Sequence, residues 1–442
     1  MQLLPDEASY PISFREEDTR QLAAAIAKRN SVELIGMKRV GISNFLRYVI
    51  YRPDIVSTYV HPTDRHLFIP IDLNDLIEVE MLAFWTLTLK RLVDVVNTNT
   101  DLEPFRAELN EIFLRSIQLR DLFYTVDAVR TAVTIVSANG LFPTLFFIRF
   151  DRMLPVVTPD LLQNLKGMID ATGHKLSYVL TTHRTLHELA PDAFPRTGTA
   201  AFYRQQYLRP AQIEDTRIIL ETFIKKYDMH LPTAQQDAVL GAAAGHVQFV
   251  QLSLLILKEQ VQRMNLVDSM DAKQGQKHAL LDGISDDERL MLQSEELYET
   301  LTVEEKKLVL ESVDRCQTYA PKDKIRLSYL WDAGYINEKD CIFSPYFHHY
   351  LRKKDEYRNS SEGSTNFSRK EHLLNEYLMA HLDSICERED IIRHVWPECN
   401  EIGVSDWAVD RLVARLRQKL QKQSSPYRIQ TIKTRGFVMK KA

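Results

Sequence analysis

The chain has 442 residues, 45% hydrophobic and 26% charged, with a net charge of -4, which fits a globular protein of about two to four domains and excludes a disordered or collagen-like chain. It contains no apolar run of about 18 residues and no signal-peptide pattern, so we expect a cytoplasmic protein without a membrane span. Four cysteines without a CxxC pair predict free thiols and argue against a disulfide framework or a zinc site.

The first 210 residues alternate short apolar segments with long amphipathic ones. The expected strands cover residues 32–36, 67–73, 144–151 and 176–182. Apolar strands separated by helices are typical of a parallel sheet with helices on both faces. The sequence therefore predicts an α/β fold for this part of the chain.

The segment after the first expected strand has the spacing of a phosphate-binding P-loop. Gly36 and Gly41 would let backbone N–H groups wrap phosphates, and the hydroxyl of Ser43 would bind Mg²⁺. Ile42 stands where such loops carry a lysine, so either Lys38 or Arg39 reaches a phosphate instead or the loop is only a tight turn. The candidate nucleotide-binding residues are Gly36, Lys38, Arg39, Gly41, Ser43, Asp151 and Thr182, with Ser43 and Asp151 as Mg²⁺ ligands.

The order of elements over residues 10–265 resembles the STAND branch of AAA-type ATPases, which is near the origin-recognition-like ATPases. The matching pieces are the lead-in 14–17, the Gly36 loop, Thr181–Thr182 as a sensor region and Gly245–His246 as a lid motif. The resemblance implies a P-loop ATPase-like domain over residues 1–210, a helical lid over 211–280 and a winged helix over 281–352, with ATP or ADP and Mg²⁺ as cofactor. Asp151 would hold Mg²⁺, or else pair with Arg149 or Arg152. Ile42, together with Arg152 where a catalytic Glu is usual, predicts very slow hydrolysis or none, so we do not expect an active enzyme.

Residues 353–366 are polar and show no apolar periodicity. This composition predicts a flexible linker, which as a coil would span on the order of 20 Å.

Residues 367–442 have the pattern of a winged helix-turn-helix, with helices expected over 370–378, 387–396 and 405–422 and two short strands around 434–437. The third helix sorts into an apolar face and a basic face. From Val404 to Ala442 there are ten Lys or Arg and two Asp, a local charge of +8. Such a face suits the DNA major groove, so the candidate DNA-binding residues are Trp407, Arg411, Arg415, Gln418, Lys419, Lys422, Lys433 and Arg435.

This last segment resembles the OmpR/PhoB-type effector domain of bacterial response regulators. The matching pieces are residues 388–396, 404–420 and 432–437. The family often has Arg, Thr and His where this chain has Trp407, Ala408 and Leu412, so the resemblance does not imply a particular DNA sequence. A winged helix that binds protein is the alternative.

Together these patterns predict a DNA-binding transcriptional regulator that acts on double-stranded DNA. Its degenerate ATPase-like module would sense a signal or nucleotide and promote homo-oligomerisation. The alternatives are an active STAND/AAA-type ATPase that acts on DNA or in signalling or defence, and an interaction scaffold.

Overall fold

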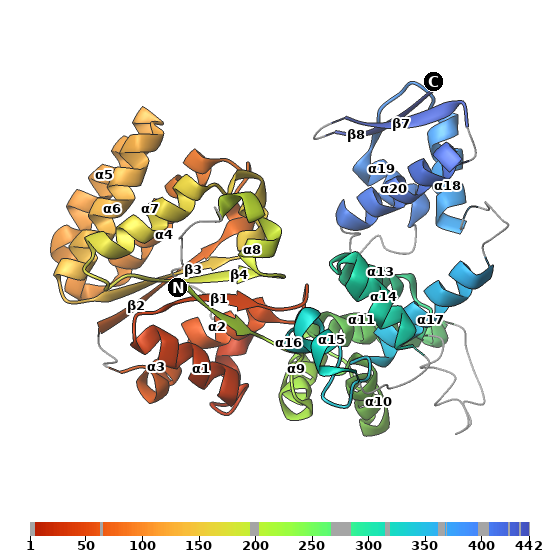
Figure 1. Ribbon diagram of the computed structural model, residues 1–442, viewed down its shortest axis with the longest axis horizontal. Coiled ribbons are helices and arrows are strands. Elements are labelled where there is room, and N and C mark those ends of the chain that lie inside the picture. The colour runs from red at the N-terminus through yellow and green to blue at the C-terminus, as the bar shows by residue number, and fades with distance from the viewer. Residues whose placement is uncertain are drawn as a thin grey trace. The chain divides into compact units, whose positions relative to one another are not determined.

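The computed structural model describes residues 5–61, 65–194, 203–266, 284–313, 319–360, 367, 369–396, 406–422, 425–432 and 435–441. The chain forms two compact units, residues 1–351 and 352–442 (Figure 1). Among the described residues, no helix is long and apolar enough to cross a bilayer.

A five-stranded parallel sheet forms the centre of the first unit. Its strands are β1 (Ser31–Ile35), β2 (His66–Asp72), β3 (Phe142–Ile148), β4 (Ser177–Thr182) and β5 (Tyr203–Tyr207), in the order β2-β3-β4-β1-β5. The first four confirm the predicted strands. The sequence did not reveal β5, because this edge strand is mostly polar and partly exposed.

Helices cover both faces of the sheet, as predicted (Figure 1). On one face lie α1 (Glu16–Ala27), α2 (Ile42–Ile50) and α3 (Pro53–Tyr59), whose core includes Phe14, Phe45 and Tyr48. On the other face lie α4 (Met81–Thr98), α5 (Arg106–Leu119), α6 (Leu122–Ala138) and α7 (Pro159–Ala171), whose core includes Trp85 and Phe147. Because β4 lies between β1 and β3, the segments that follow these three parallel strands meet at one edge of the sheet.

The rest of the first unit is helical. Its helices are α9 (Ile213–Lys226), α10 (Thr233–Ala243), α11 (Val247–Leu266), α13 (Glu288–Glu299), α14 (Val303–Glu311), α15 (Pro321–Arg326), α16 (Tyr329–Asp332) and α17 (Pro345–Ser360). One buried cluster joins these helices to Ile35 at the end of β1 and to Met37 and Val40 of the loop that follows. The predicted lid and the predicted winged helix over 281–352 therefore share one core. Apart from the helices, the described part of 281–352 contains one antiparallel bridge, between Ile336 and Ile342.

Two expectations from the sequence are corrected here. The predicted linker 353–366 is not coil over its first part, because α17 continues to Ser360. Charged residues are good helix formers even without an apolar stripe, and Arg352 pairs with Glu356 one turn later at 3.8 Å. Cys341 is disulfide-bonded rather than a free thiol, whereas Cys386 is free and buried.

The second unit contains α18 (Arg369–Ala380), β6 (Cys386–Glu387), α19 (Arg388–Val395), α20 (Asp406–Lys422), β7 (Tyr427–Ile432) and β8 (Gly436–Lys441). Its antiparallel sheet has the order β6-β8-β7. The three predicted helices are confirmed, and the strands are longer than expected, because β7 ends at Ile432 and β8 begins at Gly436. Gly436 has a φ of 150°, and a Cβ there would lie 2.1 Å from the carbonyl oxygen of Cys386, so only glycine lets β6 and β8 pair.

Candidate nucleotide and nucleic-acid sites

The loop between β1 and α2 is held by backbone contacts on both sides. The N–H of Gly36 donates to the carbonyl of Thr182 on β4 (3.1 Å), and the carbonyl of Arg39 accepts from the N–H of Gln248 on α11 (3.4 Å). Gly41 has a φ of 114°, and a Cβ there would lie 2.4 Å from Val247. A Cβ at Gly36 would lie 2.8 Å from the carbonyl oxygen of Leu208, so packing requires glycine at both positions, and the positive φ requires it at Gly41 as well.

A buried histidine fixes the direction of the loop. His246 is fully buried, and burial lowers its pKa to about 4, so the ring is neutral. Its Nδ1 accepts from the N–H of Phe249 (3.4 Å), and therefore its Nε2 carries the proton and donates to the carbonyl of Lys38 (3.0 Å). The lid motif predicted at Gly245–His246 is the element that anchors the loop.

A cavity of about 590 Å³ opens over this loop. Six Lys or Arg and four Asp or Glu line it, which favours an anionic ligand. The first turn of α2 lies at this end of the loop, and the N–H groups of a helix's first turn favour an anion; here the N–H of Phe45 already donates to the carbonyl of Gly41 (3.0 Å). The structure brings all the predicted nucleotide-binding residues to this cavity: Gly36, Lys38, Arg39, Gly41, Ser43, Asp151 and Thr182.

The loop cations are paired with a residue that the sequence did not reveal. Glu296 on α13 lies 3.2 Å from Nε of Arg39 and 3.8 Å from the ammonium of Lys38. Its side chain is 11% exposed. No local pattern could identify Glu296, because it is separated from the loop by more than 250 residues of sequence.

Asp151 and Thr182 line the cavity, but each has a partner. β3 ends at Ile148, so Asp151 lies beyond the strand in the 3-10 helix η5 (Phe150–Val156), where its carboxylate is 3.0 Å from Nδ1 of His183. The hydroxyl of Thr182 donates to Glu33 (3.4 Å). Of the two arginines considered as partners of Asp151, Arg149 pairs with Asp72 and Arg152 hydrogen-bonds Asn74.

The cavity offers two oxygen ligands of the kind that Mg²⁺ prefers, the hydroxyl of Ser43 and the carboxylate of Asp151. No cluster of three or more His, Cys, Asp or Glu suited to a metal occurs within the described residues. Magnesium at nucleotide sites takes one or two protein ligands together with phosphate oxygens and water, so these two residues fit that arrangement. Asp151 would have to exchange His183 for the ion.

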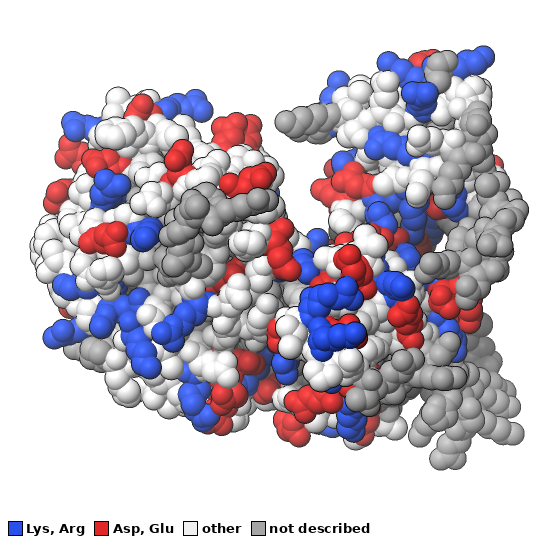
Figure 2. All heavy atoms as spheres, in the orientation of Figure 1, with Lys and Arg blue, Asp and Glu red and all other residues white. Residues whose placement is uncertain are grey.

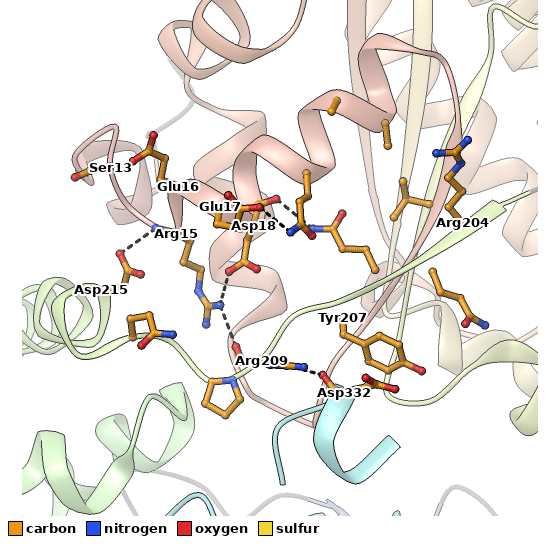
Figure 3. A pocket seen from close by; sticks show the side chains of 18 of the residues that line it. Ser13, Arg15, Glu16, Glu17, Asp18, Arg204, Tyr207, Arg209, Asp215 and Asp332 are labelled. Carbon is orange, nitrogen blue, oxygen red and sulfur yellow. Dashed lines mark hydrogen bonds and ion pairs between the residues drawn. The ribbon is translucent and has the colours of Figure 1, made fainter. Parts of the chain in front are cut away.

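A second cavity of about 1120 Å³ lies between α1, β5 and the start of α9 (Figure 3). Here Arg15 donates through its backbone to Asp215 (2.9 Å) and through its guanidinium to Asp18 and to the carbonyl of Arg209 (both 3.0 Å). Six Asp or Glu face four Lys or Arg in its lining. Because acidic residues outnumber basic ones and Arg15 is already paired, this cavity is a poor anion site. The contacts of Arg15 instead connect the segment before α1 to α9.

In the second unit, α20 has one side in the domain core and one side toward solvent. Val409, Leu412, Val413 and Leu416 are fully buried. Gln418 is exposed, while Trp407 and Arg411 are half-buried. Arg388 on α19 pairs with Asp406 (3.6 Å) and with Asp410, the two acidic residues of the helix. This pairing reduces the negative charge near the exposed side.

Two of the predicted DNA-binding residues form ion pairs within the domain. Glu371 on α18 is buried, and its carboxylate lies 2.6 Å from the ammonium of Lys419 and 3.8 Å from Nε of Arg415. Arg415 and Lys419 therefore lie on the side of α20 that faces α18. This pairing could not be predicted from the periodicity of α20 alone, because Glu371 belongs to another helix.

The remaining predicted contacts lie at the end of α20 and in the hairpin. Arg435 is exposed at the turn between β7 and β8, and Figure 2 shows Lys and Arg side chains over this hairpin. Lys433 and the side chain of Lys422 lie outside the described residues.

Comparison with known proteins identifies the second unit. Residues 362–439 match the family "Transcriptional regulatory protein, C terminal". The predicted OmpR/PhoB-type domain is thereby confirmed. No curated protein matches the chain.

Several solved structures are similar to the chain at low identity. The Aeropyrum pernix ORC1 protein in complex with DNA is 12% identical, with 99% of this chain and 90% of that chain covered and a TM-score of 0.41. A Walker-type ATPase of Pyrococcus abyssi is 16% identical, with 76% and 95% covered and a TM-score of 0.43. The Aeropyrum pernix ORC2 protein in ADPNP–ADP complexes is 10% identical, with 93% and 95% covered and a TM-score of 0.44.

Proposed function

We propose that this chain is a DNA-binding transcriptional regulator whose second unit binds double-stranded DNA. The observation that carries the proposal is α20, a helix whose apolar side is buried and whose opposite side carries Arg411 and Gln418. The match of residues 362–439 to a transcriptional regulatory family supports it.

In this proposal Trp407, Arg411 and Gln418 face base edges in the major groove, because they lie on the side of α20 opposite the core. Arg415 and Lys419 would contact phosphates along the side held by Glu371. Arg435 would reach the neighbouring minor groove or its phosphates from the hairpin turn. Lys422 and Lys433 belong to the same proposed surface.

We further propose that the first unit is an ATPase-like module that binds ATP or ADP in the cavity above the β1–α2 loop. The excess of lining cations and the position of the first turn of α2 support a phosphate ligand there. Ser43 and Asp151 would hold Mg²⁺, which would neutralise phosphate charge. Residues 211–280 would form a lid over the nucleotide, and 281–352 a winged helix that packs on it.

Catalysis should be very slow in this module. Ile42 offers neither charge nor donor to a γ-phosphate, and Arg152 hydrogen-bonds Asn74 instead of orienting a water. We expect the full chain with ATP and Mg²⁺ to release phosphate well below about 1 s⁻¹, the lower end of the usual enzyme range. Faster release would mean that Lys38, Arg39 or a second subunit supplies the missing charge, and the active-ATPase alternative would hold.

Oligomerisation of the first unit would raise the local concentration of two DNA-binding units, so that paired half-sites are bound more tightly than single ones. Selection of bound fragments by the full chain from a random DNA pool tests the whole proposal. We expect one enriched sequence, present as two half-sites. Failure of the chain to retain any DNA would favour a protein-binding winged helix and hence the scaffold alternative.

A further inference from the structure

The β1–α2 loop already holds an anion that the chain itself supplies. The carboxylate of Glu296 meets both cations of the loop, at 3.2 Å from Arg39 and 3.8 Å from Lys38. The side chains of Lys38 and Arg39 are 29% and 45% exposed, whereas that of Glu296 is 11% exposed. A carboxylate placed on the cations at a P-loop-like turn takes the place that a nucleotide phosphate would require.

The loop itself has little freedom to leave Glu296. Its carbonyls are bound by His246 and by the N–H of Gln248, and its Met37 and Val40 side chains are buried in the helical core. If a phosphate displaces the carboxylate, the side chain of Glu296 must therefore leave the loop, and α13, which packs in the same core, would respond to the loss of this contact.

Helix α13 is joined to the end of the first unit by packing. Tyr298, two residues after Glu296, contacts Tyr350 of α17 with ring centroids 5.9 Å apart. Helix α17 continues without a break to Ser360, within the second unit. A displacement of α13 would thus act on the helix from which the DNA-binding unit follows.

We propose that Glu296 is an internal competitor of nucleotide phosphate, and that the exchange of Glu296 for phosphate on Lys38 and Arg39 releases α13 and so couples nucleotide binding to α17. This inference rests on the proposed nucleotide binding of the same cavity. The nucleoside part of the ligand does not enter the exchange, because only phosphate oxygens compete with the carboxylate. Affinity for phosphate-bearing ligands is therefore held below its intrinsic value by Glu296.

The test compares Glu296→Gln with wild type in the full chain, by calorimetric titration with ATP, with tripolyphosphate and with adenosine. Glu299→Gln is the matched control, because Glu299 lies on the same helix but pairs with Lys306 at 2.8 Å. We expect Glu296→Gln to bind ATP and tripolyphosphate about tenfold more tightly, within the range of typical site coupling, and the control to bind as wild type does. Adenosine affinity should be the same in all three proteins.

A second readout follows α13 directly. Hydrogen exchange of residues 288–299 should increase when ATP is added to the wild type, and should be high in Glu296→Gln even without ATP. Equal ATP affinity of wild type and Glu296→Gln would overturn the competition and leave nucleotide binding intact. If neither protein bound ATP or tripolyphosphate, the nucleotide site and the competition would both be refuted. If Glu299→Gln also bound ATP more tightly, the gain would come from the loss of any negative charge on α13 and not from Glu296 in particular, which would contradict the competition.

Discussion

The β1–α2 loop and helix α20 each present basic side chains to a proposed anionic ligand, and in each a carboxylate from another helix engages two of them. In α20 the carboxylate of Glu371 comes from the same small domain, and Arg411 lies elsewhere on the exposed side. In the loop Glu296 comes from α13 and engages both Lys38 and Arg39. In our proposal, Glu371 neutralises part of a DNA-binding face, whereas Glu296 competes with the ligand of the loop.

The largest effect is expected from breaking one of the contacts that join the sheet to the α13–α17 helices, because this should weaken the first unit and leave the second unit unchanged. Arg184, after β4, forms two hydrogen bonds with Glu305 of α14 (2.8 and 2.9 Å) and lies 3.9 Å from the ring centre of Tyr329. Both charged side chains are nearly buried, at 7% and 4% exposed. Arg184→Ala should destabilise the first unit by about 3–5 kcal/mol, since Glu305 would lose its main partner.

Denaturant unfolding resolved by hydrogen exchange of each unit measures this effect. The second unit should keep its stability. Arg217→Ala is the control, because its pair with Asp237 is largely exposed and should matter by less than about 1 kcal/mol. An equal loss in both units would contradict their independence.

The DNA-binding face is tested by the double substitution Arg411→Ala with Arg415→Ala. Loss of a base contact and a phosphate contact should weaken binding of the full chain to its selected DNA by about 100-fold or more. The dependence of affinity on salt should also flatten. The double variant Arg20→Ala with Arg91→Ala, which removes two exposed cations of the first unit, should bind DNA as wild type does. Unchanged affinity of the Arg411/Arg415 variant would refute the assignment of α20.

The sequence predicted the elements that have strong local patterns. Four apolar strands and the three helices of the second unit were confirmed, because their burial follows a period that can be read from the chain. The candidate nucleotide-binding residues of the glycine loop, together with Asp151 and Thr182, do line one cavity, because the parallel strands that precede them end at one edge of the sheet. The sequence missed the polar edge strand β5, and it missed two pairings between residues that are distant along the chain, Glu296 with Arg39 and His183 with Asp151. Such pairings leave no local pattern.

One buried acid of the sheet should make the stability of the first unit depend on pH in a way that the second unit does not share. Glu33 on β1 is fully buried, and burial raises its pKa from 4.5 to about 7. The folded protein keeps a proton that the unfolded chain releases, so this group lowers the stability of the first unit as pH rises from about 4.5 to about 7. The shift corresponds to about 3 kcal/mol at most.

Glu33→Gln should therefore be more stable than wild type at pH 8 and similar to it at pH 4.5. Unfolding free energies of the first unit at both pH values measure this. Glu16→Gln is the control, because Glu16 is exposed and pairs only with Arg20 among the described contacts. Parallel profiles of wild type and Glu33→Gln would show that Glu33 stays ionised in the folded chain.

The smallest change in DNA affinity is expected from substitution of Glu371. Whether the affinity rises or falls decides how the role of Glu371 differs from that of Glu296. If Glu371 only neutralises part of the basic face, Glu371→Gln adds one net positive charge beside Arg415 and Lys419. DNA affinity at low salt should then rise by less than about tenfold, and the slope of affinity against salt should steepen by about one phosphate contact. Glu376→Gln, on the same helix but exposed and paired with His372, should bind with the wild-type slope. Weaker binding by Glu371→Gln, with both units still folded, would instead mean that Glu371 positions the cations for DNA. Glu371 would then be part of the DNA-binding surface, whereas Glu296, which reaches the loop from α13, would compete with the phosphate ligand of the loop.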